Sequence, residues 1–322
     1  MINGEAYSGE RVLVTGGAGF IGSNLVRRLV DLSADVVVFD DFSNGLRSNL
    51  EDVESIEVIE ADIRDSEAVF KAAEGCSKVF HLAALGSVPR SLEAPGPSYH
   101  VNLYGSVNVF EAARRAGAQN TVYASSSSVY GNTESRYKRE GEEGSPISPY
   151  AASKAAMELA ARTHAACYEM DILGLRFFNV FGPYQRPDAA YAAVVPLFTD
   201  ALNQGRQPTI FGDGLQVRDF TYVGDVVHAL LLAGAASGNP RGEALNVSSG
   251  VGQSVLDIFS AVRAAAGFSA DLQPVHAPER AGDIRVSRAD IGQAKVRLGF
   301  EPDWTLEDGM KKYVEWYNTR PI

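Results

Sequence analysis

The sequence predicts an α/β fold in which a doubly wound parallel sheet is followed by a smaller C-terminal α/β domain. Three observations predict it: apolar strand-like runs alternate with helical ones, a glycine-rich turn follows the first run, and the pattern becomes irregular after about residue 178. Such alternation is typical of a parallel sheet with helices on both faces. The expected strands are residues 11–15, 35–39, 56–60, 78–82, 121–126 and 172–177.

The division into domains follows from the change in pattern. Residues 1–178 are expected to form the large domain and residues 179–322 the smaller one. The smaller domain would lie over the carboxyl-terminal edge of the sheet, where such folds bind ligands. Residues 217–248 are expected to return to the large domain, since they include an apolar, helix-like run. Long alanine-rich helices are expected over about 98–116 and 149–169.

The composition limits the class of protein. The 322 residues are 45% hydrophobic, which is enough for a sizeable core. A formal net charge of −11 argues against a nucleic-acid-binding protein, which needs a basic face. No apolar run approaches the ~18 residues that suggest a membrane span, and no secretory leader is visible. Cys76 and Cys167 lie far apart and the five histidines lack metal-ligand spacing, so we expect a reduced, cytoplasmic protein without a metal site.

A glycine-rich turn joins the first strand to a helix. The turn reads Gly16-Gly17-Ala18-Gly19-Phe20-Ile21-Gly22. Gly16 permits the tight turn, Gly19 lets the backbone approach a pyrophosphate, and Gly22 allows close helix packing. The free N–H groups at the helix start, around Phe20 and Ile21, would face the phosphates. The turn therefore predicts a Rossmann-type dinucleotide site.

Two acids follow the second expected strand, residues 35–39. They are Asp40 and Asp41. An acid at this strand end can accept hydrogen bonds from an adenosine ribose and would repel a 2′-phosphate. The cofactor is therefore predicted to be NAD rather than NADP.

A Tyr-x-x-x-Lys pair is the second chemical motif. Ser148 is expected to cap a helix that starts at Pro149, so Tyr150 and Lys154 would project from one face of it. A lysine ammonium beside a phenol favours the phenolate and lowers the pKa of the tyrosine. Tyr150 is therefore a candidate proton acceptor. A serine-rich strand end lies shortly upstream, Ala124-Ser125-Ser126-Ser127-Ser128.

With five further motifs, these features resemble the extended short-chain dehydrogenases/reductases, and within them the nucleotide-sugar 4-epimerases. The resemblance runs from about residue 10 to the C-terminus, and its further motifs are residues 61–65, 81–84, 176–182, 212–220 and 280–285. It implies a tightly bound, catalytic NAD. The further residues that it places beside NAD are Asp62, Ile63, Leu82, Ala83 and Ala84.

The resemblance also implies the chemistry. Tyr150 would remove the proton of a sugar hydroxyl, and Lys154 would hold the nicotinamide ribose. Ser126, with Ser127 as the neighbouring candidate, would orient the reacting oxygen. Related dehydratases and decarboxylases carry acids where this chain has Ser127 and Ser128. Without them, the accessible chemistry is oxidation to a 4-keto sugar and its reduction, and inversion at C4 makes the enzyme an epimerase.

A UDP-sugar is the substrate that the matching positions imply. Arg218 and Arg280 would bind the diphosphate, because an arginine fork can pair with a phosphate. Asn179 would lie on the sugar-phosphate side. The backbone around Ala193 and Val194 would enclose the uracil.

Three features narrow the sugar. Residues 83–91, and Gln185 followed by residues 190–196, are similar to bacterial polysaccharide-type UDP-N-acetylglucosamine 4-epimerases. In those enzymes the positions that match Gly86, Ser87 and Gln185 face the sugar. The family's gatekeeper position is Ser287, which leaves room for a 2-acetamido group. UDP-N-acetylglucosamine and its C4 epimer are therefore expected first, with UDP-glucose and UDP-galactose as further candidates.

Two kinds of alternative remain: a different sugar substrate, and a different class of protein. Residues 185–189 are Gln-Arg-Pro-Asp-Ala where the polysaccharide-type enzymes have Gln-Asp-Pro-Asn-Gly. Arg186 could favour a carboxylate, so a UDP-glucuronate or UDP-N-acetylglucosaminuronate 4-epimerase is an alternative. Alternatives of another functional class are a nucleotide-sugar reductase that carries out net redox chemistry and a non-catalytic NAD-binding protein.

A homodimer is expected from the two alanine-rich helices. Residues 98–116 and 149–169 are long enough to pair with their copies in a four-helix bundle, as the family does. The small alanine side chains allow the close approach of such helices.

Overall fold

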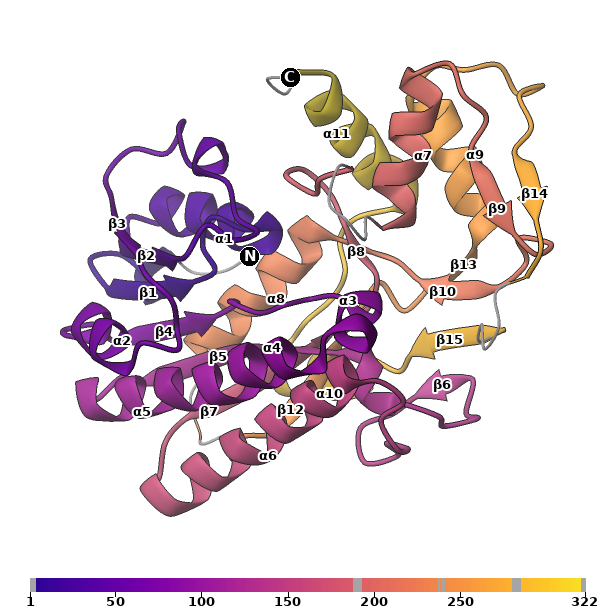
Figure 1. Ribbon diagram of the computed structural model, residues 1–322. Helices are drawn as coiled ribbons and strands as arrows, with labels where there is room; N and C mark the ends of the chain where they lie inside the picture. Colours follow the sequence, from indigo (N-terminus) through magenta and orange to yellow (C-terminus); the bar gives the residue numbers. More distant parts are fainter. Residues whose placement is uncertain (1–3, 188–192, 237, 239–240, 280–284, 320–322) are drawn as a thin grey trace.

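A seven-stranded parallel sheet forms the centre of the larger lobe, with the order β12-β7-β5-β4-β1-β2-β3 (Figure 1). The computed structural model describes residues 4–187, 193–236, 238, 241–279 and 285–319. The strands are β1 (Arg11–Thr15), β2 (Asp35–Asp40), β3 (Ile56–Glu60), β4 (Lys78–His81), β5 (Asn120–Ser126), β7 (Ile172–Phe177) and β12 (Ala244–Val247). The predicted doubly wound sheet and its six predicted strands are confirmed.

Helices cover both faces of this sheet, as Figure 1 shows. One face carries α1 (Phe20–Asp31) and α8 (Val223–Ala235), and the other carries α2 (Ser66–Ala73), α5 (Ser106–Ala116) and α6 (Pro149–Tyr168). Side chains alternate along a strand, so Val12 and Val14 of β1 join the core beneath α1 and α8. Leu13 between them joins the core beneath α2, α5 and α6.

The helix expected over 98–116 is not one regular helix. It consists of α4 (Pro95–Tyr99), a π-helical segment (His100–Gly105) and α5. A methyl group at Gly105 would lie 2.6 Å from the Ile63 side chain, so the backbone passes very close to that residue. Wide π-helical turns often occur at functional sites, and this one presents Asn102 to the middle of the lobe.

Helix α6 begins where the sequence predicts. The Ser148 hydroxyl accepts a hydrogen bond from the Ala151 N–H at 3.1 Å, and Pro149 occupies the first helical position. Both features fix the helix start just before Tyr150, because the cap satisfies a terminal donor and proline has no N–H there to leave unpaired.

The smaller lobe holds a four-stranded sheet with the order β13-β10-β15-β6. Its strands are β13 (Gly252–Ser254), β10 (Val217–Asp219), β15 (Val286–Ala289) and β6 (Tyr137–Lys138). Two-stranded sheets pair β14 (Val275–Ala277) with β9 (Thr209–Phe211), and β11 (Thr221–Tyr222) with β8 (Val180–Phe181). The remaining helices are α3 (Val88–Glu93), α7 (Val194–Asn203), α9 (Val255–Ala265), α10 (Gly292–Leu298) and α11 (Leu306–Thr319).

Strands of the two main sheets interleave along the chain. β10 belongs to the small sheet, whereas α8 and β12, which follow it, pack on or join the large one. β6 lies early in the sequence and yet pairs with β15. The two lobes are therefore linked by several crossings of the chain rather than by one.

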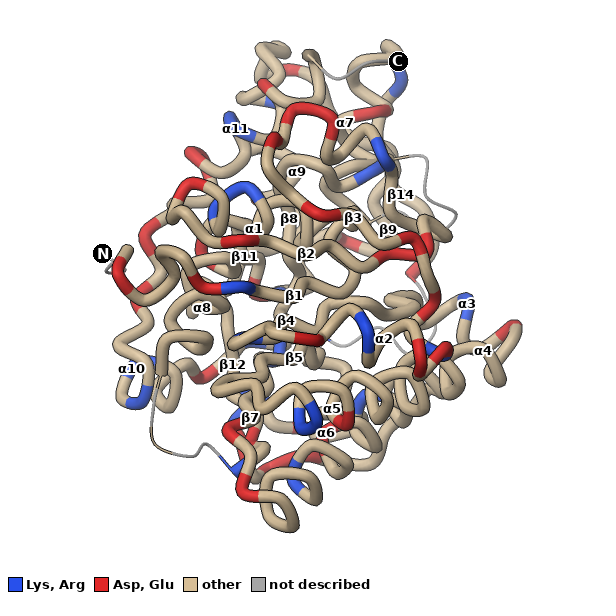
Figure 2. Tube along the Cα trace, turned by 90° about the vertical axis from the view of Figure 1, so that its left-hand side faces the viewer, with Lys and Arg blue, Asp and Glu red and all other residues tan. Residues whose placement is uncertain are grey.

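Charges are spread along the chain. Figure 2 shows Lys and Arg scattered among Asp and Glu rather than gathered on one part of the trace. Among the described helices, none is long and apolar enough to cross a membrane.

Candidate active site

The glycine-rich turn between β1 and α1 is packed so closely that its glycines are required. Gly16 has φ 72°, and a methyl group there would lie 2.6 Å from the Ala83 nitrogen. A methyl group at Gly22 would lie 2.0 Å from the Gly16 carbonyl oxygen. α1 starts at Phe20 without a side-chain cap from the described residues, so the N–H groups of its first turn are available to an anion.

A narrow cleft of about 110 Å³ lies beside this turn. It is lined by nine of the residues predicted to bind NAD: Gly16, Gly19, Asp40, Asp41, Asp62, Ile63, Leu82, Ala83 and Ala84. A cradle of glycines at a helix start and two acids at a strand end fit a dinucleotide without a 2′-phosphate. Phe20, Ile21 and Gly22 belong to the adjoining first turn of α1.

The two acids at the end of β2 differ in their surroundings. Asp40 is 6% exposed, and its carboxylate accepts hydrogen bonds from the Ala18 and Phe42 N–H groups, both at 2.9 Å. Burial raises the pKa of Asp40. Asp40 thus braces the glycine-rich turn, whereas Asp41 is exposed and bonded to Ser43.

Asp62, which also lines the cleft, is paired with Arg64. The Arg64 Nε lies 2.9 Å from the Asp62 carboxylate, and the Arg64 N–H also donates to it at 2.8 Å. These bonds lower the pKa of Asp62. The residue is therefore held as a carboxylate at the cleft wall.

His81, at the end of β4, is fully built into the core. Its Nδ1 lies 2.7 Å from the Thr15 hydroxyl and its Nε2 lies 2.8 Å from the Ser106 hydroxyl. Ser106 donates to the Asn102 carbonyl, so it accepts from Nε2, and Nδ1 accepts from Thr15. Burial, and then the charge of Lys154, lower the pKa of His81 to about 3. His81 is therefore a neutral structural residue.

Asn102 extends this network toward α6. Its amide pairs with the backbone of Leu85, through bonds of 2.8 and 3.2 Å, and donates to the Ser153 hydroxyl at 3.0 Å. Ser153 in turn donates to the Tyr150 carbonyl at 2.8 Å. The cofactor cleft and the start of α6 are thus fixed to each other by buried polar contacts, which the sequence motifs alone had not revealed.

Tyr150, Lys154 and Ser126 come together where α6 passes the end of β5. The Lys154 ammonium donates to the Ala124 carbonyl at 2.7 Å, and the Ser126 hydroxyl is close enough to Tyr150 to hydrogen-bond with it. Ser126 also caps the following 3-10 turn, Ser127–Tyr130, by accepting from the Ser128 N–H.

The expected lowering of the Tyr150 pKa is not what the structure shows. Shielding from water raises the pKa of Tyr150, and the hydrogen bond with Ser126 opposes this only in part. Burial also lowers the pKa of Lys154, to about 8. The prediction from the Tyr-Lys spacing was wrong in direction, because it counted the lysine charge and left out desolvation.

A larger cavity of about 530 Å³ is lined by residues of β8, α7, β9, β10 and the start of α9 and of the adjoining loops. Its lining includes the predicted substrate residues Asn179, Gln185, Ala193, Val194 and Arg218. The Asn179 amide donates to the Asp219 carbonyl at 3.0 Å, which orients it at the cavity wall. Gln185 has a buried side-chain oxygen with no partner among the described residues.

Six other predicted substrate residues line neither cavity: Ser126 and Tyr150, described above, and Gly86, Ser87, Ser127 and Ser287. Gly86 is exposed, and Ser87 caps α3 by accepting from the Arg90 N–H. Ser127 begins the 3-10 turn after β5. Ser287 on β15 is the register partner of Arg218 on β10, so the two lie side by side. Arg280 lies outside the described residues. No group of three or more metal-ligating side chains occurs within the described part of the chain.

Similarity to known proteins identifies the family of this chain. The family model described as the NAD dependent epimerase/dehydratase family matches residues 12–248. The UDP-glucose 4-epimerase of Mycolicibacterium smegmatis is 41% identical over 315 residues, covering 96% of this chain and 99% of the relative. UDP-glucuronate 4-epimerase 2 of Arabidopsis thaliana is 34% identical, covering 96% and 76%.

One solved structure has nearly the same fold over nearly its whole length. It is the UDP-N-acetylglucosamine 4-epimerase from Methanobrevibacter ruminantium M1 in complex with UDP-N-acetylmuramic acid. The TM-score is 0.91 at 35% identity, covering 97% of this chain and 99% of the other. The chain therefore belongs to the NAD dependent epimerase/dehydratase family, as an NAD-dependent enzyme of its nucleotide-sugar 4-epimerase branch.

Proposed function

We propose that this protein interconverts the C4 epimers of a UDP-hexose, with UDP-N-acetylglucosamine as the first candidate substrate. The observation that carries the proposal is the meeting of Tyr150, Lys154 and the Ser126 hydroxyl at the end of β5. Ser127 and Ser128 follow directly and supply no acid for a dehydration or decarboxylation. The proximity of Ser126 to Tyr150 supports Ser126 rather than Ser127 as the hydroxyl that orients the reacting oxygen.

Each of the three side chains has a definite task in this proposal. Tyr150 accepts the proton of the sugar 4-hydroxyl, and Ser126 holds that oxygen in place. Lys154 stabilises the tyrosine phenolate and holds the nicotinamide ribose. Bound NAD supplies the oxidising and then the reducing equivalent at C4. The 4-keto sugar must turn over between the two steps, after which Tyr150 returns the proton.

The larger cavity suits a nucleoside diphosphate. Arg218, and Arg280 beyond the described residues, would pair with the diphosphate. Asn179 would contact the sugar-phosphate side, and the backbone at Ala193 and Val194 would enclose the uracil. The cavity volume of about 530 Å³ is in the usual range for small-molecule sites.

Fewer of the described residues define the sugar pocket than define the site for the nucleoside diphosphate. A methyl group at Gly86 would meet no described atom within 4 Å, which supports an open space there. Ser87 and Gln185 would complete the wall, with Ser287 beside the C2 substituent. Ser287 is the cross-strand partner of Arg218. This supports a role for Ser287 as the gatekeeper, because the sugar would then lie beside the arginine that binds the diphosphate. The structural neighbour that acts on UDP-N-acetylglucosamine favours this substrate.

A UDP-uronate is the alternative substrate. Arg186 lies one residue from Gln185 and could pair with a carboxylate. The similarity to a plant UDP-glucuronate 4-epimerase supports this reading.

We also propose a homodimer through α5 and α6. These helices lie side by side in Figure 1. Two large apolar side chains are exposed in the single chain: Tyr104, in the π-helical segment that leads into α5, at 57%, and Leu159 of α6 at 65%. Burial of such side chains against a second copy would stabilise the pair.

NMR of the purified protein with UDP-N-acetylglucosamine, UDP-glucose and UDP-glucuronate, each without added NAD, tests the function. An epimerase converts its substrate on the cofactor that it carries. A reductase would instead consume NADH in proportion to product, and a non-catalytic NAD-binding protein would convert none of the three sugars.

A further inference from the structure

A buried ion pair lies behind the reacting residues, outside both cavities. Glu158 follows Lys154 by one helical turn on α6 and is 4% exposed, and Arg176 on β7 is 1% exposed. The guanidinium grips the carboxylate through two bonds, Nε to Oε1 at 2.9 Å and Nη2 to Oε2 at 2.7 Å. A forked pair of this kind fixes both distance and orientation.

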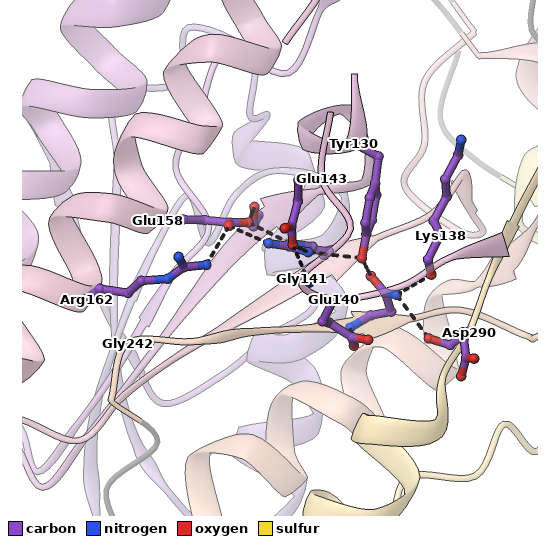
Figure 3. Close-up of polar contacts among 12 residues, drawn as sticks. Tyr130, Lys138, Glu140, Gly141, Glu143, Glu158, Arg162, Gly242 and Asp290 are labelled. Carbon is purple, nitrogen blue, oxygen red and sulfur yellow. Dashed lines mark hydrogen bonds and ion pairs between the residues drawn. The ribbon is translucent and has the colours of Figure 1, made fainter. Parts of the chain in front are cut away.

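The same guanidinium is held from a second side. Its Nη1 donates to the Tyr130 hydroxyl at 3.0 Å and to the Glu143 carboxylate. Figure 3 shows Glu158, Glu143 and Tyr130 converging on this point, with Arg162 reaching Glu158 from the outside. The Tyr130 hydroxyl donates onward to Asn246 on β12 at 2.7 Å. Arg176 therefore has little freedom to move.

Glu158 reaches back to the strand that carries the proposed catalytic serine. The Ser125 hydroxyl donates to Glu158 Oε1 at 2.5 Å, and the Ala124 carbonyl accepts from Lys154 at 2.7 Å. Two successive turns of α6 thus hold two successive residues of β5, and the next residue is Ser126. The position of Ser126 relative to Tyr150 therefore depends on this contact.

Glu158 also affects the charge of Lys154. Burial lowers the pKa of Lys154 to about 8, and the Glu158 charge opposes that lowering. The other groups around Lys154 are Tyr150 on its own helix and His81 on β4, which is neutral because its pKa is about 3. Arg176 and Glu143 lie on the far side of Glu158. Glu158 is therefore the carboxylate that favours the Lys154 ammonium.

We propose that Glu158, anchored by Arg176, is a positioning residue for the epimerase reaction: it sets Ser126 against Tyr150 through Ser125 and keeps Lys154 in its ammonium form. The proposal rests on the function proposed above. Buried ion pairs are weak evidence for stability, since hydrophobic replacements are often as stable. A role in positioning would explain why the Glu158–Arg176 ion pair is buried beside the reacting groups.

Three variants separate position from charge. Glu158→Gln removes the charge and leaves an amide oxygen that can still accept from Ser125. Ser125→Ala removes the contact to β5 and leaves the ion pair. The control is Arg162→Gln, because Arg162 lies 3.7 Å from the same carboxylate with half of its side chain exposed. Holoenzyme is used throughout, and kcat, KM and thermal unfolding are measured across pH.

Glu158→Gln should move the alkaline limb of kcat/KM to lower pH by about one unit or more, because Lys154 then loses its proton sooner. Ser125→Ala should lower kcat by roughly tenfold or more with unchanged KM and unchanged pH limbs. Arg162→Gln should match the wild type. Wild-type kcat in Ser125→Ala refutes the positioning role, and it does so even if Glu158→Gln does not fold.

A sugar-free measurement keeps the two proposals apart. The protonation of Lys154, followed by NMR of its carbon-13-labelled ε-carbon and assigned by its loss in Lys154→Met, can be titrated in the holoenzyme without substrate. Glu158→Gln should lower the pH at which Lys154 loses its proton, because the Glu158 charge opposes the lowering of the Lys154 pKa. If the wild type converts no UDP-sugar, the proposed function fails. If the wild type turns over while Glu158→Gln keeps the wild-type pH limbs and the wild-type Lys154 titration, the charge role alone is refuted.

Discussion

Gly22→Ala is the sharpest test of the cofactor turn. The new methyl group would lie 2.0 Å from the Gly16 carbonyl oxygen and 2.8 Å from the Gly17 Cα, both backbone atoms. Real Cβ contacts are essentially never below 3.0 Å, so α1 or the turn must shift by about 1 Å. The turn is not free to yield, because the Gly16 N–H donates to the Phe39 carbonyl at 2.8 Å.

The expected cost follows from this overlap. Overfilling a packed site costs about 1–3 kcal/mol, and a shifted α1 would point its first N–H groups away from the pyrophosphate. Each ~1.4 kcal/mol corresponds to a tenfold change in binding, so NAD affinity should fall by roughly ten- to a hundred-fold. The variant should therefore contain less NAD after purification, and calorimetry should give a higher dissociation constant for NAD.

Gly4→Ala is the matched control. Its methyl group would lie 3.8 Å from the Leu32 side chain, which is an ordinary contact. This variant should keep the wild-type melting temperature and cofactor content. A Gly22→Ala protein with full NAD content and wild-type affinity would refute the reasoning about the turn.

Four further outcomes are expected. Tyr150→Phe should reduce turnover by ~10²–10⁴-fold while NAD and UDP-sugar still bind; near wild-type turnover would mean that Tyr150 is not the base. Ser287→Tyr should slow UDP-N-acetylglucosamine epimerisation by roughly ten- to a hundred-fold and spare UDP-glucose; equal effects on both sugars would remove Ser287 as the gate. The kcat/KM should fall above about pH 8, where Lys154 loses its ammonium proton; a rate that stays level to high pH would contradict this. Leu159→Glu should turn a dimer into a monomer in light scattering, and a wild type that is monomeric at every concentration would disprove the dimer.

The large sheet could be predicted because its signals are local. Each strand is a short apolar run between polar turns. Ser148 and Pro149 mark the start of α6, as its N-cap and its first helical residue. The glycine-rich turn likewise carries its own geometry, since Gly16 and Gly22 admit no side chain. None of these features needs a distant partner to be recognised.

Features that depend on distant partners were missed or only partly predicted. The stretch 98–116 has a continuous helical pattern, but its middle turn is π-helical where Asn102 reaches Leu85 and Ser153. β6 is two residues long and pairs with β15, about 150 residues later, so nothing local distinguishes it. Asp40 was predicted to face a ribose, but its carboxylate also holds the Ala18 and Phe42 N–H groups.

The periodicity of α6 contains one more signal than the Tyr-Lys spacing. Tyr150, Lys154 and Glu158 follow one another at four-residue intervals, so all three lie along one side of the helix. The sequence alone does not tell whether a third polar residue on such a stripe faces water or the core. Arg176 decides this, because a glutamate can be buried only beside a cation that compensates its lost hydration. With Arg176 on β7 next to β5, the stripe becomes a row of contacts that aligns helix and strand, and the end of that row is where Tyr150 meets Ser126.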